Sequence, residues 1–127
     1  MQRELSRCVD VALQRRLEET NFTNSEQLLG DCYYNTKKLA TVLSEYNISY
    51  SIYNGALMGD YRPDEQPKSF EDAKEIGLVH YWIESNGYIC EISSESRKDE
   101  YMGQSVVLPS RPDNYIVFED SVTERIL

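Results

Sequence analysis

The sequence has few of the residues that build metal centres or disulfide frameworks. It contains one histidine, His80, and three cysteines at unrelated spacings, Cys8, Cys32 and Cys90. These spacings do not define a set of disulfides, and no C-x-x-C pair accompanies the histidine as a zinc site would require. We therefore expect no metal and no cofactor, and we expect the reducing environment of the cytoplasm.

Long apolar segments and an excess of positive charge are missing as well. No run of about 18 apolar residues occurs, so we expect no transmembrane helix, and the N-terminus lacks the apolar region of a signal peptide. The 22 acidic residues outnumber the 13 basic residues, which gives a formal net charge of −9. This charge repels phosphate backbones and anionic lipids, so neither nucleic acid nor a membrane is an expected partner.

The composition suits a single folded domain over residues 1–127. Hydrophobic residues make up 40% of the chain, which is enough for a real core at this length. Ten tyrosines are unusual, and they suit strands and half-exposed surfaces. No internal repeat or low-complexity segment marks a domain boundary.

The first part of the chain has the periodicity of helices. An apolar residue at every fourth position predicts an amphipathic helix over residues 2–19. Asp31 can cap a second helix over residues 32–46, and Asn47 follows it where a left-handed C-cap belongs. We expect both helices to pack on whatever sheet the rest of the chain forms.

The second part has the alternation of strands. Residues 48–53 predict a strand that turns at Asn54-Gly55, and residues 58–69 hold a glycine and two prolines, which predicts a loop. A short helix to about Glu75 should follow, and a charged, solvated link is expected after Ser93. Further strands are expected over residues 78–84, 105–108 and 115–118, and a helical turn over 121–127. Helices followed by an antiparallel meander place the chain in the α+β class.

A hairpin is the strongest local signal. Asn86-Gly87 favours a type I′ turn, because both central residues of that turn need positive φ. Counting outward from this two-residue loop puts Trp82 opposite Glu91 and makes Glu91 the diagonal neighbour of His80, on one face of the sheet. A carboxylate beside the sole histidine is the base-and-orienter half of a nucleophilic triad. The alternative is a partly buried histidine with an ordinary hydrogen bond.

Cys32 is the candidate nucleophile. It is expected in the first turn of the second helix, where free N–H groups and the partial positive charge of the helix end favour a thiolate. Asp31 and the overall acidity oppose ionisation, so a thiolate needs His80 as its partner. Considered alone, Cys32 is more often a small buried hydrophobe.

Four short motifs point to a known group of enzymes. They are Gly30-Asp31-Cys32, Asn47-Ile48, the strand His80-Tyr81-Trp82-Ile83-Glu84, and Glu91 on the next strand. Over about residues 28 to 93 this order resembles the transglutaminase-like branch of the papain-like cysteine enzymes. Two positions depart from the family pattern, because Glu91 stands where aspartate is usual and Asn47 replaces a glycine.

The resemblance implies a papain-like α+β fold, with N-terminal helices packed on an antiparallel sheet. It also implies a small thiol hydrolase or acyl-transfer enzyme that acts on a peptide or amide bond of a peptide or protein substrate. In that reaction Cys32 attacks a carbonyl, His80 moves the proton, and Glu91 orients His80.

Two further residues are candidates for substrate binding. Trp82 would line the cleft beside His80, and Gln27 is the nearest amide side chain upstream of Cys32 that could serve an oxyanion hole. The alternatives are a core tryptophan and a plain surface glutamine.

A second hypothesis keeps the fold and drops the chemistry. On this view the protein is a catalytically silent binding module, for example a viral or mobile-element accessory protein, and it acts through its tyrosine-rich surface or the loop of residues 58–69. The reactivity of Cys32 separates the two hypotheses.

Overall fold

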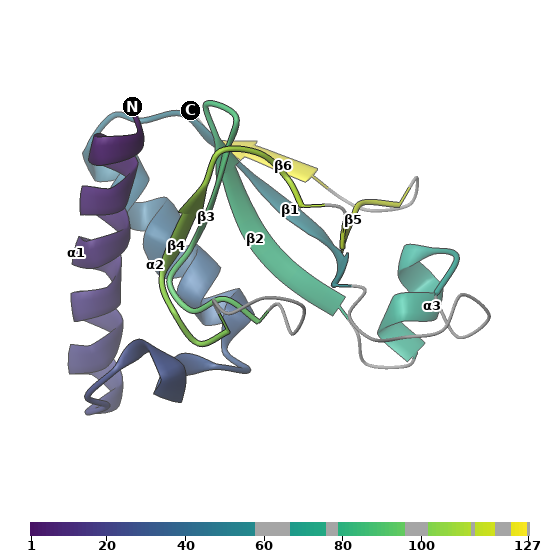
Figure 1. Ribbon diagram of the computed structural model, residues 1–127, viewed down its shortest axis with the longest axis horizontal. Helices are drawn as coiled ribbons and strands as arrows, with labels where there is room; N and C mark the ends of the chain where they lie inside the picture. Colours follow the sequence, from purple (N-terminus) through teal and green to yellow (C-terminus); the bar gives the residue numbers. More distant parts are fainter. Residues whose placement is uncertain (58–66, 76–78, 96–101, 113, 119–122, 127) are drawn as a thin grey trace.

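Two long helices lie against one face of a curled antiparallel sheet (Figure 1). The computed structural model describes residues 1–57, 67–75, 79–95, 102–112, 114–118 and 123–126. Within these ranges the order of elements is helical first and strand-rich afterwards. The α+β class expected from the sequence is confirmed.

The helices begin and end close to the predicted positions. Their bounds are Gln2–Thr20 for α1, Ser25–Leu28 for the 3-10 helix η1, Cys32–Glu45 for α2 and Phe70–Glu75 for α3. Asn47 has a φ of 58°, so it takes the left-handed conformation expected beyond the end of α2. None of the helices in the described ranges is both long and apolar enough to cross a membrane.

In the described part of the chain the sheet has six strands, five of them in one row. The strands are β1 (Tyr50–Leu57), β2 (Val79–Ser85), β3 (Tyr88–Glu91), β4 (Val106–Leu108), β5 (Tyr115–Ile116) and β6 (Thr123–Ile126). The row runs β4-β3-β2-β1-β5, and β6 also pairs with β1. The first four strands therefore form the expected meander, after which the chain crosses to the far side of β1.

The hairpin of β2 and β3 has the predicted register. Asn86 and Gly87 have φ values of 52° and 85°, as a type I′ turn needs. Ser85 pairs with Tyr88 next to this turn, and the antiparallel pairing continues outward to Ile83 and Cys90. This register brings His80 and Glu91 to the same face.

The turn predicted at Asn54-Gly55 is wrong, because β1 continues through both residues. Gly55 pairs with His80 on β2. A Cβ atom added to Gly55 would lie 2.0 Å from the carbonyl oxygen of Ile116 on β5. Gly55 therefore serves the close approach of another backbone, which is the other common reason for glycine inside a strand.

The helical turn predicted over residues 121–127 is also wrong where the structure describes it. Residues 123–126 form β6, which pairs antiparallel with residues 50–53 of β1. Pairing of this kind covers backbone groups that an edge strand would leave open. Of the loop predicted over residues 58–69, positions 58–66 lie outside the described residues.

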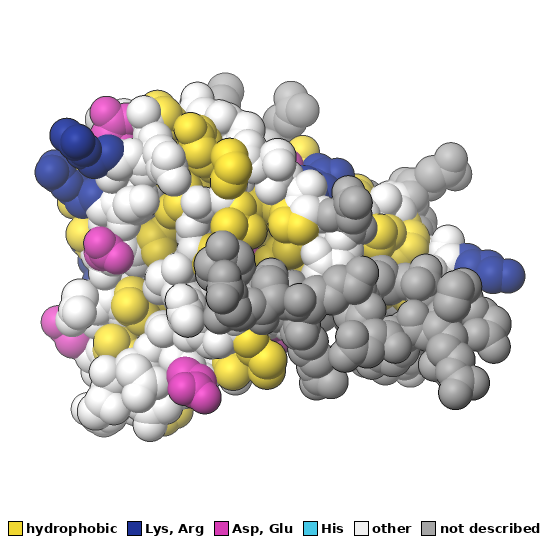
Figure 2. Space-filling view, in the orientation of Figure 1, with side chains coloured by type: hydrophobic (Ala, Val, Ile, Leu, Met, Phe, Trp, Pro, Cys, Tyr) yellow, Lys and Arg dark blue, Asp and Glu magenta, His cyan; other side chains and the backbone are white. Residues whose placement is uncertain are grey.

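The two faces of the sheet have different surroundings. The larger core cluster joins α1 and α2 to the helix-facing side chains of the sheet, among them Ile83 and Cys90. A second cluster is built around Trp82, Ile89 and Tyr115. Figure 2 shows hydrophobic side chains reaching the surface over the strands, whereas charged side chains gather toward the edge formed by α1.

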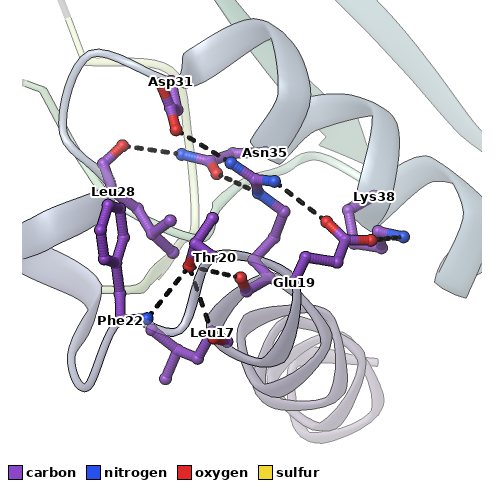
Figure 3. Close-up of polar contacts among 9 residues, drawn as sticks. Leu17, Glu19, Thr20, Phe22, Leu28, Asp31, Asn35 and Lys38 are labelled. Carbon is purple, nitrogen blue, oxygen red and sulfur yellow. Dashed lines mark hydrogen bonds and ion pairs between the residues drawn. The ribbon is translucent and has the colours of Figure 1, made fainter.

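A buried arginine, Arg16, ties α1 to the first turn of α2 through Asp31 and Asn35, which are labelled in Figure 3. The guanidinium of Arg16 donates to Asn35 Oδ1 at 3.0 Å and to Asp31 Oδ2 at 2.9 Å. Asn35 in turn donates from Nδ2 to the carbonyl of Leu28 at 3.1 Å. Asp31 and Asn35 lie on either side of Cys32 in the chain, so this network fixes the helix end that presents Cys32.

Substitution of Arg16 by alanine should lower stability through this network. The change removes the donor to the buried oxygen of Asn35, so we expect a loss of about 1–3 kcal/mol in the free energy of unfolding. Urea denaturation of the two proteins measures this loss. The control is Arg15→Ala, which removes only an exposed ion pair with Glu45 and should cost much less. Equal effects of the two substitutions would contradict the role given to Arg16.

Candidate functional site

The centre of the site is a buried contact between His80 and Glu91. Their side chains are 3% and 5% exposed, and His80 Nε2 lies in hydrogen-bond contact with Glu91 Oε1. A carboxylate can only accept hydrogen bonds, so Nε2 carries the hydrogen. The second nitrogen of the ring, Nδ1, is then available to other groups.

Aromatic side chains hold this pair in place. Tyr115 donates its hydroxyl hydrogen to Glu91 Oε2, so both oxygens of the carboxylate are engaged. Trp82 stacks on the imidazole with ring centroids 5.8 Å apart, and Tyr115 meets its edge at 6.0 Å. The close approach of β5 at Gly55 is what brings Tyr115 to this position.

Cys32 reaches the same imidazole from the beginning of α2. It is half-buried, and its sulfur lies within 4.8 Å of a ring nitrogen of His80. Since Nε2 is engaged by Glu91, Nδ1 is the nitrogen that faces the sulfur. The structure therefore brings together all three residues that the sequence nominated for catalysis.

Glu95 is a fourth member that the sequence analysis missed. The charged link expected after Ser93 was predicted to be solvated, but the Glu95 side chain is only 24% exposed. Its Oε2 atom lies 3.9 Å from His80 Nδ1, and a carboxyl oxygen lies within 4.8 Å of the Cys32 sulfur. The one signal in the sequence was the two-residue alternation of side chains, which predicts that Glu95 and Glu91 point to the same side of the chain.

Backbone hydrogen bonds fix the segment that holds Glu95. The Ser94 N–H donates to the Gln104 carbonyl at 2.9 Å, and the Gly103 N–H donates to the Ser94 carbonyl at 2.7 Å. Ser25 of η1 donates to the Gly103 carbonyl at 2.6 Å. These bonds join residues far apart in the sequence, so local patterns do not reveal them.

The electrostatics of the site favour a charged imidazole. Burial by itself lowers the pKa of His80, but the Glu91 carboxylate and Cys32 together raise it well above its usual range. Burial also raises the pKa of Glu95, and the nearby Glu91 charge adds to this effect. The sulfur of Cys32 thus faces an imidazolium that the protein stabilises.

The two residues predicted to bind substrate have structural roles here. Trp82 is fully buried, so it supports the imidazole from within the core and does not line an open cleft. Gln27 closes a capping box with Asn24, and its Oε1 accepts from the Thr23 N–H at 2.7 Å. A contact of Gln27 with the substrate stays a prediction.

A cavity of about 570 Å³ lies on the side of the sheet that faces α2. It lies between α2 and strands β1 and β2, and Thr36, Ala40, Thr41, Tyr50 and Ile52 are among its lining residues. Tyr33 and Tyr81, the chain neighbours of Cys32 and His80, also line it. Their rings meet edge to face with centroids 5.4 Å apart.

Cys32, His80 and Glu95 also form a group that can hold a metal ion. One possible ligand atom from each residue lies within 4.8 Å of the others. Sulfur, imidazole nitrogen and carboxylate oxygen are all ligands of Zn²⁺. The C-x-x-C criterion used on the sequence cannot detect such a set, because its members come from three separate segments.

Comparison with known proteins adds no relative. No family model, no curated protein and no solved structure matches the chain. The class of this protein is therefore defined by its fold and its site alone. The chain is an α+β protein in which a helix-terminal cysteine meets a buried histidine–glutamate pair.

Replacing Glu95 by glutamine should change how stability depends on pH. A carboxyl whose pKa is raised on folding binds more protons in the folded state, so its contribution to stability falls as pH rises above the ordinary value of 4.5. Glutamine cannot ionise. The stability of Glu95→Gln relative to wild type should therefore increase between pH 4 and pH 8, as measured by urea denaturation with a chelator present.

The control for this experiment is Glu75→Gln. Glu75 is exposed on α3, so its substitution removes the same charge without relieving burial. We expect a smaller change with pH for this variant. A difference in stability between Glu95→Gln and wild type that does not change with pH would contradict the burial of the Glu95 carboxyl.

Proposed function

We propose that the protein is a small thiol hydrolase or acyl-transfer enzyme that acts on a peptide or amide bond. The observation that supports this most strongly is the placement of the Cys32 sulfur within 4.8 Å of a ring nitrogen of His80, whose Nε2 contacts Glu91. It supplies a nucleophile, a proton carrier and an orienting carboxylate in the order that such catalysis needs. The transglutaminase-like, papain-like assignment belongs to this proposal, and it rests on the motifs of the sequence.

The reaction begins with the thiolate of Cys32 and the imidazolium of His80. The sulfur attacks the carbonyl carbon of the substrate and forms an S–C bond. His80 then gives its Nδ1 proton to the leaving amine as the C–N bond breaks, which leaves a thioester on Cys32. Glu91 keeps the ring oriented throughout, because its bond to Nε2 is unaffected by the transfer.

The thioester is resolved by water or by a second amine. His80 takes a proton from the incoming group as that group attacks the thioester carbon, and the S–C bond breaks to restore the thiolate. Water gives hydrolysis, and an amine gives acyl transfer. The backbone N–H of Cys32, at the first residue of α2, is the proposed donor to the oxyanion.

The cavity between α2 and the sheet is the proposed position for a substrate side chain. Its lining combines aromatic and aliphatic side chains with several hydroxyls and with the charged side chains of Lys37 and Glu45. Tyr33 and Tyr81 connect it to Cys32 and His80 along the chain. A peptide with an apolar or aromatic side chain near the scissile bond suits this lining.

The alkylation of Cys32 by iodoacetamide tests the thiol chemistry. Burial raises the pKa of Cys8 and raises that of Cys90 to about 12, so neither competes with Cys32 at neutral or acidic pH. With a chelator present, we expect wild type to react well below the pH range of a free thiol. His80→Ala should lose this reactivity, because the thiolate loses its counter-charge.

The contrary result is an ordinary thiol profile that His80→Ala leaves unchanged. It would mean that the helix end and the hairpin are scaffold, and that the silent binding module is the correct hypothesis. A second variant, Cys32→Ser, confirms that the modified residue is Cys32. Circular dichroism confirms that each variant is folded.

The role of the cavity is tested with two alkylating reagents of different size. Thr41 is exposed and lines the cavity, so Thr41→Trp should fill part of it. We expect the rate with free iodoacetamide to stay the same and the rate with iodoacetamide carried on a short peptide to fall several-fold. Gln14→Trp, on the exposed face of α1, is the control. Equal rates for both reagents in Thr41→Trp would exclude this cavity from substrate binding.

A further inference from the structure

Three different ligand types converge at one point of the molecule. Cys32 comes from the first turn of α2, His80 from β2, and Glu95 from the segment that follows β3. The three ligand atoms lie within 4.8 Å of one another. Sulfur, nitrogen and oxygen in one cluster form a donor set that suits a soft divalent ion better than Mg²⁺ or Ca²⁺.

The spacing is close to that of a zinc site. With bonds of about 2.0–2.3 Å, two ligand atoms on one tetrahedral zinc lie roughly 3.3–3.8 Å apart. The separation between His80 Nδ1 and Glu95 Oε2 is 3.9 Å, so a shift of a few tenths of an ångström brings both to bonding distance. The Cys32 sulfur, which lies within 4.8 Å of the ligand atoms of the other two residues, completes the set.

A second observation also points to a cation. The Oε2 atom of Glu95 is buried and accepts no hydrogen bond from the described part of the chain. A buried acceptor without a partner is unfavourable, and a bound cation would satisfy it. This oxygen is the one that faces His80 Nδ1.

The environment of His80 completes the arrangement. Histidines that bind metals commonly donate their other ring N–H to a carboxylate, which fixes the tautomer and the ring orientation. His80 does this with Glu91, whose second oxygen accepts from Tyr115. The nitrogen left for a metal is Nδ1, the same atom that faces Cys32 and Glu95.

We propose that Cys32, His80 and Glu95 bind Zn²⁺ reversibly and that the bound ion blocks the Cys32 sulfur. The proton shared between the Cys32 sulfur and His80 Nδ1 leaves to solvent as the S–Zn and N–Zn bonds form, and any proton on the Glu95 carboxyl leaves in the same way. A thiolate and a carboxylate then balance the charge of the ion. The binding of Zn²⁺ does not depend on the proposed acyl chemistry. Only the inference that bound Zn²⁺ controls enzyme activity rests on the proposed function.

Co²⁺ titration of the full chain, with all thiols reduced, tests the binding. Co²⁺ takes the geometry of Zn²⁺ and gives visible absorption bands together with a thiolate charge-transfer band. We expect both in wild type and in the control Cys8→Ala, and we expect excess Zn²⁺ to remove them. Cys32→Ser should lose the charge-transfer band, and Glu95→Gln should weaken Co²⁺ binding by about tenfold or more.

Protection of Cys32 supplies an independent readout. Zn²⁺ in small excess should slow its alkylation by iodoacetamide in wild type, a chelator should reverse the effect, and Glu95→Gln should be protected much less. The zinc proposal would be overturned if the charge-transfer band were absent, or if Zn²⁺ protected wild type and Glu95→Gln equally. Failure of the proposed function is different, because it appears as slow alkylation in metal-free protein.

Discussion

The hydrogen bond between His80 and Glu91 is the contact on which the site depends. Both side chains are almost completely buried, and a buried imidazole and carboxylate are costly unless each is fully partnered. The partners come from several parts of the chain. The type I′ turn sets the register of β2 and β3, and Tyr115 on β5 binds the second oxygen of Glu91. Gly55 allows β5 to come this close to β1. Several strands of the sheet therefore contribute to keeping this one polar pair partnered.

The position of Cys32 depends on a second buried polar group. Arg16 joins α1 to Asp31 and Asn35, so the end of α2 is held by α1 while its side chains pack on the sheet. Two separate polar networks thus meet at the sulfur, one that fixes the imidazole and one that fixes the helix end. Glu95 lies close to both, with its carboxyl near the Cys32 sulfur and His80 Nδ1. This shared position explains why the same three residues can serve a thiol reaction or hold a metal ion.

The sequence predicted the parts of the structure that short-range chemistry decides. Asn86-Gly87 specified the hairpin and its register, and the helix bounds followed from caps and periodicity. The site residues Cys32, His80 and Glu91 were found because a helix end and a hairpin have known geometry. Gly55 was misjudged because its reason lies 61 positions away, at Ile116. Glu95 was missed because its place depends on backbone bonds to Gly103 and Gln104, which no local pattern encodes.

The most direct test of the account uses the fact that His80 is the only histidine in the chain. Selective ¹⁵N labelling of histidine then reports the protonation and tautomer of this one ring by NMR, in metal-free protein across a pH series. We predict that the imidazolium of His80 persists well above the ordinary pKa of 6.5 and that Glu91→Gln lowers the pKa of His80. An ordinary titration near 6.5 that Glu91→Gln does not change would contradict the buried pair, and the proposed thiol chemistry would lose its basis.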